Sequence, residues 1–485
     1  MTKKIICLML ALLILVSLFS CAGTADKKDN EKDGSQGESS LQNGAFKAGY
    51  GIADITPELP IELNTNDKLT RVQEPIYATC VAVSDGENTV LLFTLDIKSI
   101  PDAQDKTVRE LVSLWTKVPE ENILFHATHN HSAPTPGVPS SSVAIAKWTQ
   151  DFRYRVLDAA KDAIADLSDA KMLSGMAKTT NFAFVRRYIH EDGTFSGIHV
   201  KNKSTTKVVR HETEADDTAQ IVRFVREDKK DILIANWQAH AAHAIETFRD
   251  AVSGDIPYHF REKLQQKDDD LLVALFFGAS GNINLTVKIP SLDICGANYR
   301  KVGARLADAV YGELENLKEI DAGKINILSA YCVSPYREVS KEQVEKAKLV
   351  VAAGEPGSAE YEEMLVKYGF NSKYEVNTVI SLGSRQGQNG RIMLRTIAFG
   401  DLAFAAVPYE MFDTNGMEVK SASPYKMTFI LATTNGSHGY MPSEVAVKNG
   451  GYEVYTSNYK YGTAEKVVGE LLEMLNEMKN TTHGQ

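Results

Sequence analysis

The sequence has few of the residues that would build a disulfide framework or a nucleic-acid interface. It holds 5 cysteines in 485 residues, and no two of them form a CxxC pair, so a thiolate zinc site of the usual spacing is excluded. The formal net charge is -10 and no basic cluster stands out, so nucleic acid is not expected as a partner. Histidine is also scarce, at 11 residues, which makes any group of histidines informative.

Long apolar runs are missing except at the N-terminus. Lys3 and Lys4 precede Ile5–Ser20, which carries no charge. As a helix rising ~1.5 Å per residue, this run would span about 24 Å, less than a bilayer core of ~30 Å, so it predicts a signal peptide. Leu18-Phe19-Ser20-Cys21 resembles the lipobox of bacterial lipoproteins and implies lipidation of Cys21. An ordinary signal peptide with an incidental cysteine is the alternative.

The segment after Cys21 is polar, charged and poor in apolar residues, so burial cannot offset the entropy cost of ordering it. We therefore expect a signal peptide over residues 1–20, a disordered tether over 21–45 and one folded domain over 46–485. The protein is expected in the bacterial cell envelope, lipid-anchored on the extracytoplasmic side. Cys80, Cys295 and Cys332 would remain in the folded part, and their odd number leaves any pairing open.

Strand-like and helix-like segments alternate through residues 46–485. Apolar runs predict strands at 89–97, 123–131, 232–240, 271–282, 396–408 and 427–436. Helical spacing of apolar residues appears near 108–115, 152–163, 299–317 and 468–475, and the charged stretch 338–367 predicts one or two surface helices. The pattern favours an α/β fold with mixed β-sheets flanked by helices.

Three histidines cluster in "ILFHATHNHSAPTPG", where an apolar run meets a turn-rich one. In a strand, residues two apart share a face, so His129 and His131 would emerge together on the side of the apolar Phe125 and Ala127. His126 would point the other way. Two imidazoles in a buried pocket need hydrogen bonds or a bound ion, so the pair indicates a metal site or a catalytic site.

Further polar groups follow other apolar runs. "NWQAHAAHA" supplies His240 and His243, "VPYEMF" supplies Glu410, and "TTNGSHGYMPSE" supplies His438 and Tyr440. "FFGASGNIN" supplies small residues suited to close backbone approach. Because catalytic groups gather at strand ends in α/β sheets, we expect these segments to meet.

Taken in order, these segments resemble the neutral/alkaline ceramidase family. "AGYGIADITP" is similar to that family's opening segment, "ATHNHSAP" to its ATHTHSGP motif, and "GASGNIN" to its GDVSPN region. "NWQAH", "VPYEMF" and "TNGSHGYMPSEVAVKNGGYEV" are similar to the family's NW…H, PGEF and SNxYxxY…YE segments. The resemblance runs from Ala48 to the C-terminus.

The resemblance implies a zinc ion held by His129, His240, Glu410 and Tyr440. Histidine nitrogen and carboxylate oxygen are normal ligands of catalytic zinc, whereas a phenol must lose its proton to the ion. His243 is the rival to His240, because the spacing after "NW" differs by one residue from that of the family.

The resemblance also assigns His131 to proton transfer or to hydrogen bonding with the scissile group, and places Tyr452 and Arg186, or else Arg187, beside the substrate. Asp96 is expected either to hold a histidine tautomer or to cap a helix. The family's proposed nucleophilic serine corresponds to Asn284 here, and Ser280 lies out of register, so we expect direct attack by water that the zinc activates. The family's C-terminal β-sandwich domain is not expected.

Together these features predict a membrane-anchored zinc hydrolase of linear amide bonds, with ceramide or another N-acyl lipid as the substrate class that the resemblance implies. Two alternatives stay open. One is a solute-binding lipoprotein without chemistry, which the lipobox and tether would fit equally well. The other keeps the zinc but acts on a non-lipid amide or an ester. The oligomeric state is not visible in the sequence.

Overall fold

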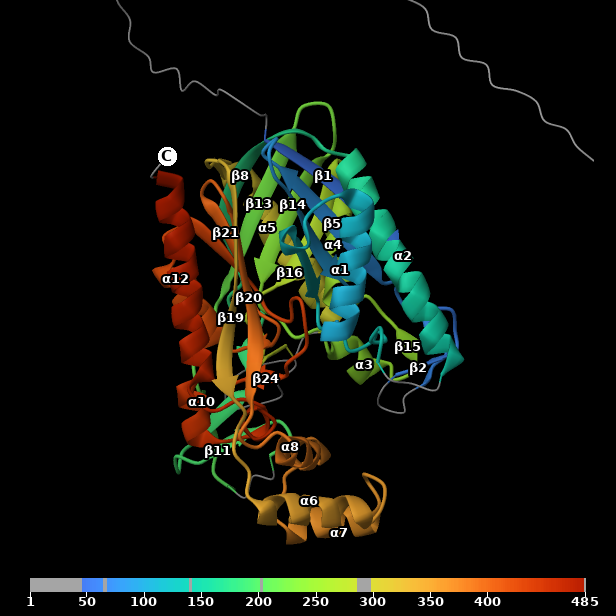
Figure 1. Ribbon diagram of the computed structural model, residues 1–485, viewed down its shortest axis with the longest axis vertical. Coiled ribbons are helices and arrows are strands. Elements are labelled where there is room, and N and C mark those ends of the chain that lie inside the picture. Colours follow the sequence, from blue (N-terminus) through green and yellow to red (C-terminus); the bar gives the residue numbers. More distant parts are fainter. Residues whose placement is uncertain (1–45, 64–67, 139–141, 201–203, 286–297, 484–485) are drawn as a thin grey trace, which may run out of the picture. The chain divides into compact units, whose positions relative to one another are not determined.

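Two β-sheets pack face to face in the computed structural model, which describes residues 46–63, 68–138, 142–200, 204–285 and 298–483 (Figure 1). The expected signal peptide, its Cys21 and the tether lie outside the described residues, as does Cys295. Cys80 and Cys332 are buried free thiols. None of the described helices combines the length and apolar character needed to cross a bilayer.

The larger sheet has nine strands and is mixed. Its strands follow the order β16 (Leu271–Phe277), β14 (Asp231–Trp237), β13 (Thr218–Arg226), β8 (Ser168–Lys178), β1 (Lys47–Asp54), β5 (Tyr77–Ser84), β6 (Thr89–Leu95) and β7 (Ile123–Ala127), with β18 (Lys318–Glu319) paired to β8. The pairs β14–β16 and β6–β7 are parallel, and the other pairs are antiparallel. Strands β6, β7, β14 and β16 are nearly continuous apolar runs because both of their faces are covered.

The smaller sheet has four strands and lies against the larger one. Its order is β19 (Ile325–Pro335), β20 (Asn389–Phe399), β21 (Leu402–Ala406) and β23 (Met427–Leu431), with β21 and β23 parallel. Val81, Leu92, Phe224, Phe404 and Phe429 belong to one fully buried apolar cluster. The core between the sheets is therefore shared by both of them.

Helices cover the outer faces of both sheets. On the larger sheet lie α1 (Asp102–Thr116), α2 (Val143–Ala165), α4 (Asp255–Lys267) and α5 (Tyr299–Gly312), and on the smaller sheet lie α9 (Asp413–Ala422) and α12 (Thr463–His483). The three helices α6 (Lys341–Ala352), α7 (Ala359–Lys367) and α8 (Lys373–Gly383) pack on a small core of their own.

Short elements complete the described chain: β2 (Ile61–Glu62), β3 (Lys68–Leu69), β4 (Arg71–Val72), β9 (Phe184–Val185), β10 (Arg187–His190), β11 (Phe195–Gly197), β12 (Val208–His211), α3 (His243–Thr247), β15 (Ala251–Val252), β17 (Ile283–Asn284), β22 (Glu410–Met411), β24 (Tyr440–Met441), α10 (Glu444–Asn449) and α11 (Tyr452–Tyr455). Several of them line the region where strands β7, β14, β16, β21 and β23 end. They carry Glu410, Tyr440 and Tyr452 of the candidate site, while His129, His131, His240 and Arg186 lie in turns between elements.

The predicted α/β class with mixed sheets flanked by helices is confirmed, and α12 is the last element of residues 46–483, without a following β-sandwich among the described ranges. The predicted strands end earlier than expected, because β7 stops at Ala127 and β14 at Trp237. The helix near residues 108–115 is present, but Trp115 is exposed and lies beside the ammonium of Lys161 instead of in the core.

His126 joins three strands at their carboxyl ends. It is the penultimate residue of β7, and its Nε2 accepts a hydrogen bond of 2.9 Å from the backbone N–H of Phe277, the last residue of β16. Nδ1 must then carry the proton, and it donates to the carbonyl of Ala432, just after β23, at 2.8 Å. Strands β7 and β16 stand at opposite ends of the strand order, so the sheet curves enough for one imidazole to bridge them.

Replacing His126 with phenylalanine should lower the free energy of unfolding at pH 8 by about 1–3 kcal/mol, because Phe277 N–H loses its buried partner and Ala432 C=O keeps only the hydrogen bond from Thr434 Oγ1. Burial lowers the pKa of native His126 to about 3, whereas the unfolded chain takes up a proton below pH ~6.5. The wild type should therefore lose stability through this group as the pH falls from 6.5 towards 3, and the gap to the variant should narrow. Urea unfolding across that range measures it, and equal stabilities at pH 8 would contradict the role of His126.

Candidate metal centre

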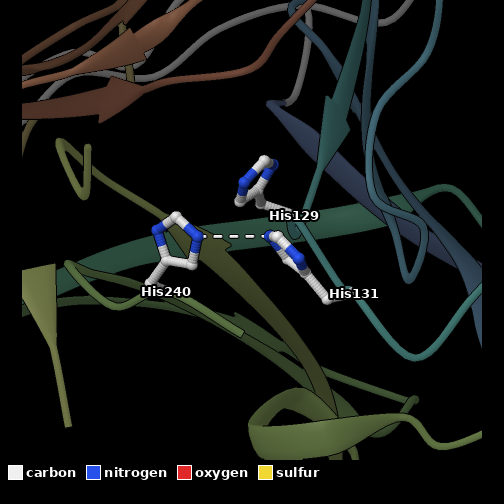
Figure 2. Close-up of side chains that lie close together, drawn as sticks. All are labelled: His129, His131 and His240. Carbon is white, nitrogen blue, oxygen red and sulfur yellow. Dashed lines mark hydrogen bonds between the residues drawn. The ribbon is translucent and has the colours of Figure 1, made fainter. Parts of the chain in front are cut away.

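Three imidazoles meet at the carboxyl ends of β7 and β14 (Figure 2). Their ligating nitrogens, one from each of His129, His131 and His240, all lie within 4.8 Å of one another. The ring centroid of His129 lies 4.6 Å from that of His131 and 4.5 Å from that of His240. His129 and His240 are 6% and 3% exposed, and His131 is the more open of the three. The three imidazoles could therefore hold a cation.

The bend after β7, and not the strand, brings His129 and His131 together. His129 has a φ of 55°, the left-handed conformation that a non-glycine residue adopts only where its surroundings enforce it. Backbone hydrogen bonds from Thr128 to Leu95 and from Asn130 to Ile97 fix the bend. The expectation that alternation along one strand aligns the two histidines is therefore wrong, although both imidazoles do reach one pocket.

His129 and Glu410 point unsatisfied atoms at each other. His129 Nδ1 donates to the carbonyl of Lys98 at 2.9 Å, which leaves a lone pair on Nε2. This Nε2 lies 3.2 Å from Glu410 Oε2, and both atoms are buried without a hydrogen-bond partner. Buried polar atoms are otherwise almost always paired. A cation between them would satisfy both, so the donor set fits a metal ion.

The parallel pairing of β22 with β24 sets Glu410 directly opposite Tyr440. Burial alone would raise the pKa of Glu410, but its interactions with His129, Arg186 and Tyr440 outweigh burial and hold the pKa below its usual value. Burial, reinforced by the negative charge of Glu410, raises the pKa of Tyr440 well above the ordinary value. Without a cation, Tyr440 is therefore a neutral phenol that contacts a carboxylate.

Arg186 reaches this pocket and Arg187 does not. Arg186 Nη2 donates to Tyr440 Oη at 3.1 Å and to the carbonyl of Gly281 at 2.8 Å, and its Nε donates to Glu453 at 2.9 Å. Arg187 donates to Glu453 and to Glu212. Both guanidinium groups are buried, so neither forms a surface salt bridge. The structure thus places Arg186, and not Arg187, beside Tyr440.

Two glycines give Tyr452 and Glu453 their positions. Gly450 and Gly451 have φ values of 71° and 103°, which L side chains rarely adopt. A Cβ on Gly451 would lie 2.7 Å from the Phe195 ring and 2.9 Å from Arg187 Nη1. The carbonyl of Gly450 also accepts a hydrogen bond from Arg187 at 2.7 Å. The turn therefore places the Tyr452 ring 5.5 Å from that of Tyr440.

His240 lies in the histidine group, and its rival His243 does not. His131 Nε2 and His240 Nε2 are 3.2 Å apart. His243 opens α3, where its backbone N–H donates to Asp255 and its Nδ1 lies 3.4 Å from the carboxylate of Glu246. Burial, with nearby cationic groups, lowers the pKa of His131 and His240 well below 6.5. Both imidazoles are thus neutral, the form in which histidine binds a metal.

Asp96 fills neither of its expected roles. Its Oδ2 accepts from the backbone N–H of Tyr77, and burial raises its pKa to about 6. The tautomer of His129 is held instead by the carbonyl of Lys98, two residues further on. Asn284 pairs with Phe184 in the β17–β9 ladder, while Ser280 contributes its carbonyl, 3.4 Å from His240 Nδ1.

Two residues that lie near the site, Lys98 and Glu453, were not identified from the sequence. Lys98 is half-buried, and burial lowers the pKa of its ammonium while the charge of Glu410 opposes that change. Glu453, 1% exposed, neutralises Arg186 and Arg187 together. A buried carboxylate shared by two adjacent arginines could have been suspected only from "VRRY", because two neighbouring cations in an apolar run need a partner.

Comparison with known proteins gives a fold and not a family. No protein-family profile matches the chain, and no curated protein matches it by sequence. Among solved structures, the neutral ceramidase from Pseudomonas aeruginosa matches with a TM-score of 0.66 and 14% identity, over 90% of this chain and 74% of that one. A ceramidase complexed with C2 matches with the same score and identity, over 90% and 76%. At this identity, the chain shares the ceramidase fold.

Proposed function

We propose that this protein is a zinc-dependent hydrolase of linear amide bonds, with N-acyl lipids such as ceramide as its substrate class. The observation that carries the proposal is the convergence of His129, His240 and Glu410, with two buried atoms left unsatisfied between His129 and Glu410. The shared ceramidase fold supports it. We propose His129, His240, Glu410 and Tyr440 as the ligands. When bound, zinc supplies a Lewis acid that polarises the amide carbonyl and activates water.

The side chains around the pocket divide the remaining work. His131 is the most exposed of the three histidines and is neutral in the empty site, with its Nε2 3.2 Å from His240 Nε2. We assign it to accept a proton during water attack and to pass that proton to the departing amine. Arg186 places a buried positive charge beside Tyr440, where it favours negative charge that develops on the carbonyl oxygen. Tyr452, whose ring lies next to that of Tyr440, is the second hydrogen-bond donor for that oxygen. Asn284, with an amide side chain, is not a nucleophile in this scheme.

We further propose that Cys21 anchors the protein to the extracytoplasmic face of a bacterial membrane. The Leu18–Cys21 sequence after an uncharged apolar run supports the anchor. A tethered enzyme would meet amphiphilic amides at the membrane surface, where their concentration is highest. The membrane would then be both the anchor and the source of substrate.

Metal content tests the ligand set. The purified protein should carry about one zinc per chain, as catalytic sites of this donor type do. His129→Ala and His240→Ala should lose it. His243→Ala is the matched control, since it is equally buried and close in sequence but outside the group, and it should keep its zinc. Elemental analysis by mass spectrometry measures this, and a zinc-loaded His129→Ala protein would contradict the site.

Turnover tests the reaction. Wild-type protein should hydrolyse N-acyl sphingoid bases, a chelator should abolish this, and added zinc should restore it. His131→Ala should keep its zinc and lose about 10²–10⁴-fold in kcat, since general acid–base catalysis contributes that much. Loss of zinc from His131→Ala would instead make all three histidines ligands. Turnover of simple esters or N-acyl amino acids alone would overturn the lipid amide as substrate.

The anchor has its own test in a bacterial host. The wild-type protein should sediment with membranes, and its N-terminal peptide should carry the mass of a lipidated cysteine. Cys21→Ser should move to the soluble fraction. Cys7→Ser, within the same apolar run, is the control and should stay with the membranes. Membrane association of Cys21→Ser without lipid on its N-terminus would rule out this anchor.

A further inference from the structure

Four aromatic rings are in continuous contact, starting from Tyr440 beside Glu410. Tyr440, opposite Glu410, has its ring centroid 5.5 Å from that of Tyr452. The Tyr452 ring in turn lies 4.9 Å from His199 and 5.7 Å from Tyr374. His199 and Tyr374 contact each other at 5.6 Å. We call these four residues the aromatic wall.

The wall passes from the protein interior to solvent. Tyr440 is 8% exposed, Tyr452 is half-buried, and Tyr374 is 38% exposed. His199, at the same outer end, is exposed as well. Its φ of 49° places it in the left-handed region, which a non-glycine residue occupies only where its surroundings support it. Exposed aromatic rings in continuous contact with a buried site are a surface that a ligand can cover.

Tyr374 is the residue that the α6–α8 helices bring to the wall. These helices have their own core, which includes Val350, Leu365 and Val379. Tyr374 is the second residue of α8, whose start is fixed because Ser372 Oγ accepts a hydrogen bond from Glu375 N–H. Its exposed ring does not pack in that core. The placement of the ring follows from the contact with Tyr452 and His199.

The side chains shown to contact the histidine group are polar. Glu410, beside His129, and Arg186, beside Tyr440, are buried or nearly buried, as are His129 and His240. The rings of the wall cross at 52–74°, so edges and faces alternate along it. Such a corrugated apolar surface suits a flexible hydrocarbon chain, which gains by covering ring faces.

The geometry points to the aromatic wall as the binding surface for an apolar arm of the amide substrate, with Tyr374 and His199 as specificity-determining residues at its outer end. This inference rests on the proposed function. It adds that turnover depends on the length of the arm, because a short arm reaches Tyr452 only and a long one reaches Tyr374.

A chain-length series tests the inference. For wild-type protein, kcat/KM on N-acylethanolamines should rise from two to twelve acyl carbons. Tyr374→Ala should lower kcat/KM about three- to tenfold for the twelve-carbon substrate, the range that an aromatic contact supports, and leave the two-carbon one unchanged. Tyr374→Phe should behave as wild type, since the ring and not the hydroxyl makes the contact. Tyr154→Ala, an exposed helix tyrosine on α2, is the matched control and should change neither substrate.

A binding measurement separates this inference from the proposed function. Calorimetry on chelator-treated protein, which has no turnover, should show tighter binding of N-dodecanoylethanolamine than of N-acetylethanolamine, and Tyr374→Ala or His199→Ala should remove that difference. If binding depends on chain length but the zinc-loaded protein hydrolyses neither amide, the aromatic wall is confirmed and the proposed hydrolase activity is wrong. Hydrolysis that ignores chain length, or an equal loss on both substrates in Tyr374→Ala at unchanged melting temperature, would overturn the wall alone.

Discussion

The candidate site depends on a few strand ends being held together, and His126 is the interaction that does this most directly. One neutral imidazole takes a hydrogen bond from the end of β16 and gives one to the chain just after β23, while its own backbone belongs to β7. His129 follows β7 by two residues, Ser280 follows β16 by three, and Tyr440 lies further along the chain from β23. Any change in the spacing of these strands would move the groups that converge on the cation pocket. His126 thus stabilises the strand ends that position the other two histidines of the motif, His129 and His131.

The sequence allows the elements to be predicted but not how far they run. Apolar runs identify β6, β7, β14 and β16, because strands buried on both faces leave a strong signal. The runs "ILFHATHNH" and "ILIANWQAH" look continuous, yet each strand stops before its last histidine. What ends β7 is the left-handed bend at His129, which backbone hydrogen bonds to the segment after β6 enforce. That is a tertiary effect, and local pattern cannot show it.

The candidate site, too, could be predicted from the sequence only in part. His129, His240, Glu410 and Tyr440 could be picked out by their places after apolar runs and by resemblance, and the structure brings all four to one region. The carbonyl of Lys98 and the carboxylate of Glu453 were not predictable. A backbone carbonyl is present at every residue and so leaves no trace in a sequence. Glu453 acts through two arginines more than 250 residues away, and only the fold places them in contact.

On the ligand set proposed above, charge balance explains why a phenol would serve as a ligand. Arg186 and Arg187 are buried cations, and Glu453 and Glu212 compensate them within hydrogen-bond distance. Within the described part of the chain, Glu410 is then the carboxylate that faces the imidazoles, and the ammonium of Lys98 lies near it, so a divalent cation there would leave at least one positive charge uncompensated in a buried site. Loss of the Tyr440 proton supplies the missing negative charge. In this proposal, the same burial that raises the pKa of Tyr440 in the empty site would make its ionisation favourable once a dication is bound, because a low local dielectric strengthens the attraction between opposite charges as it penalises an isolated charge.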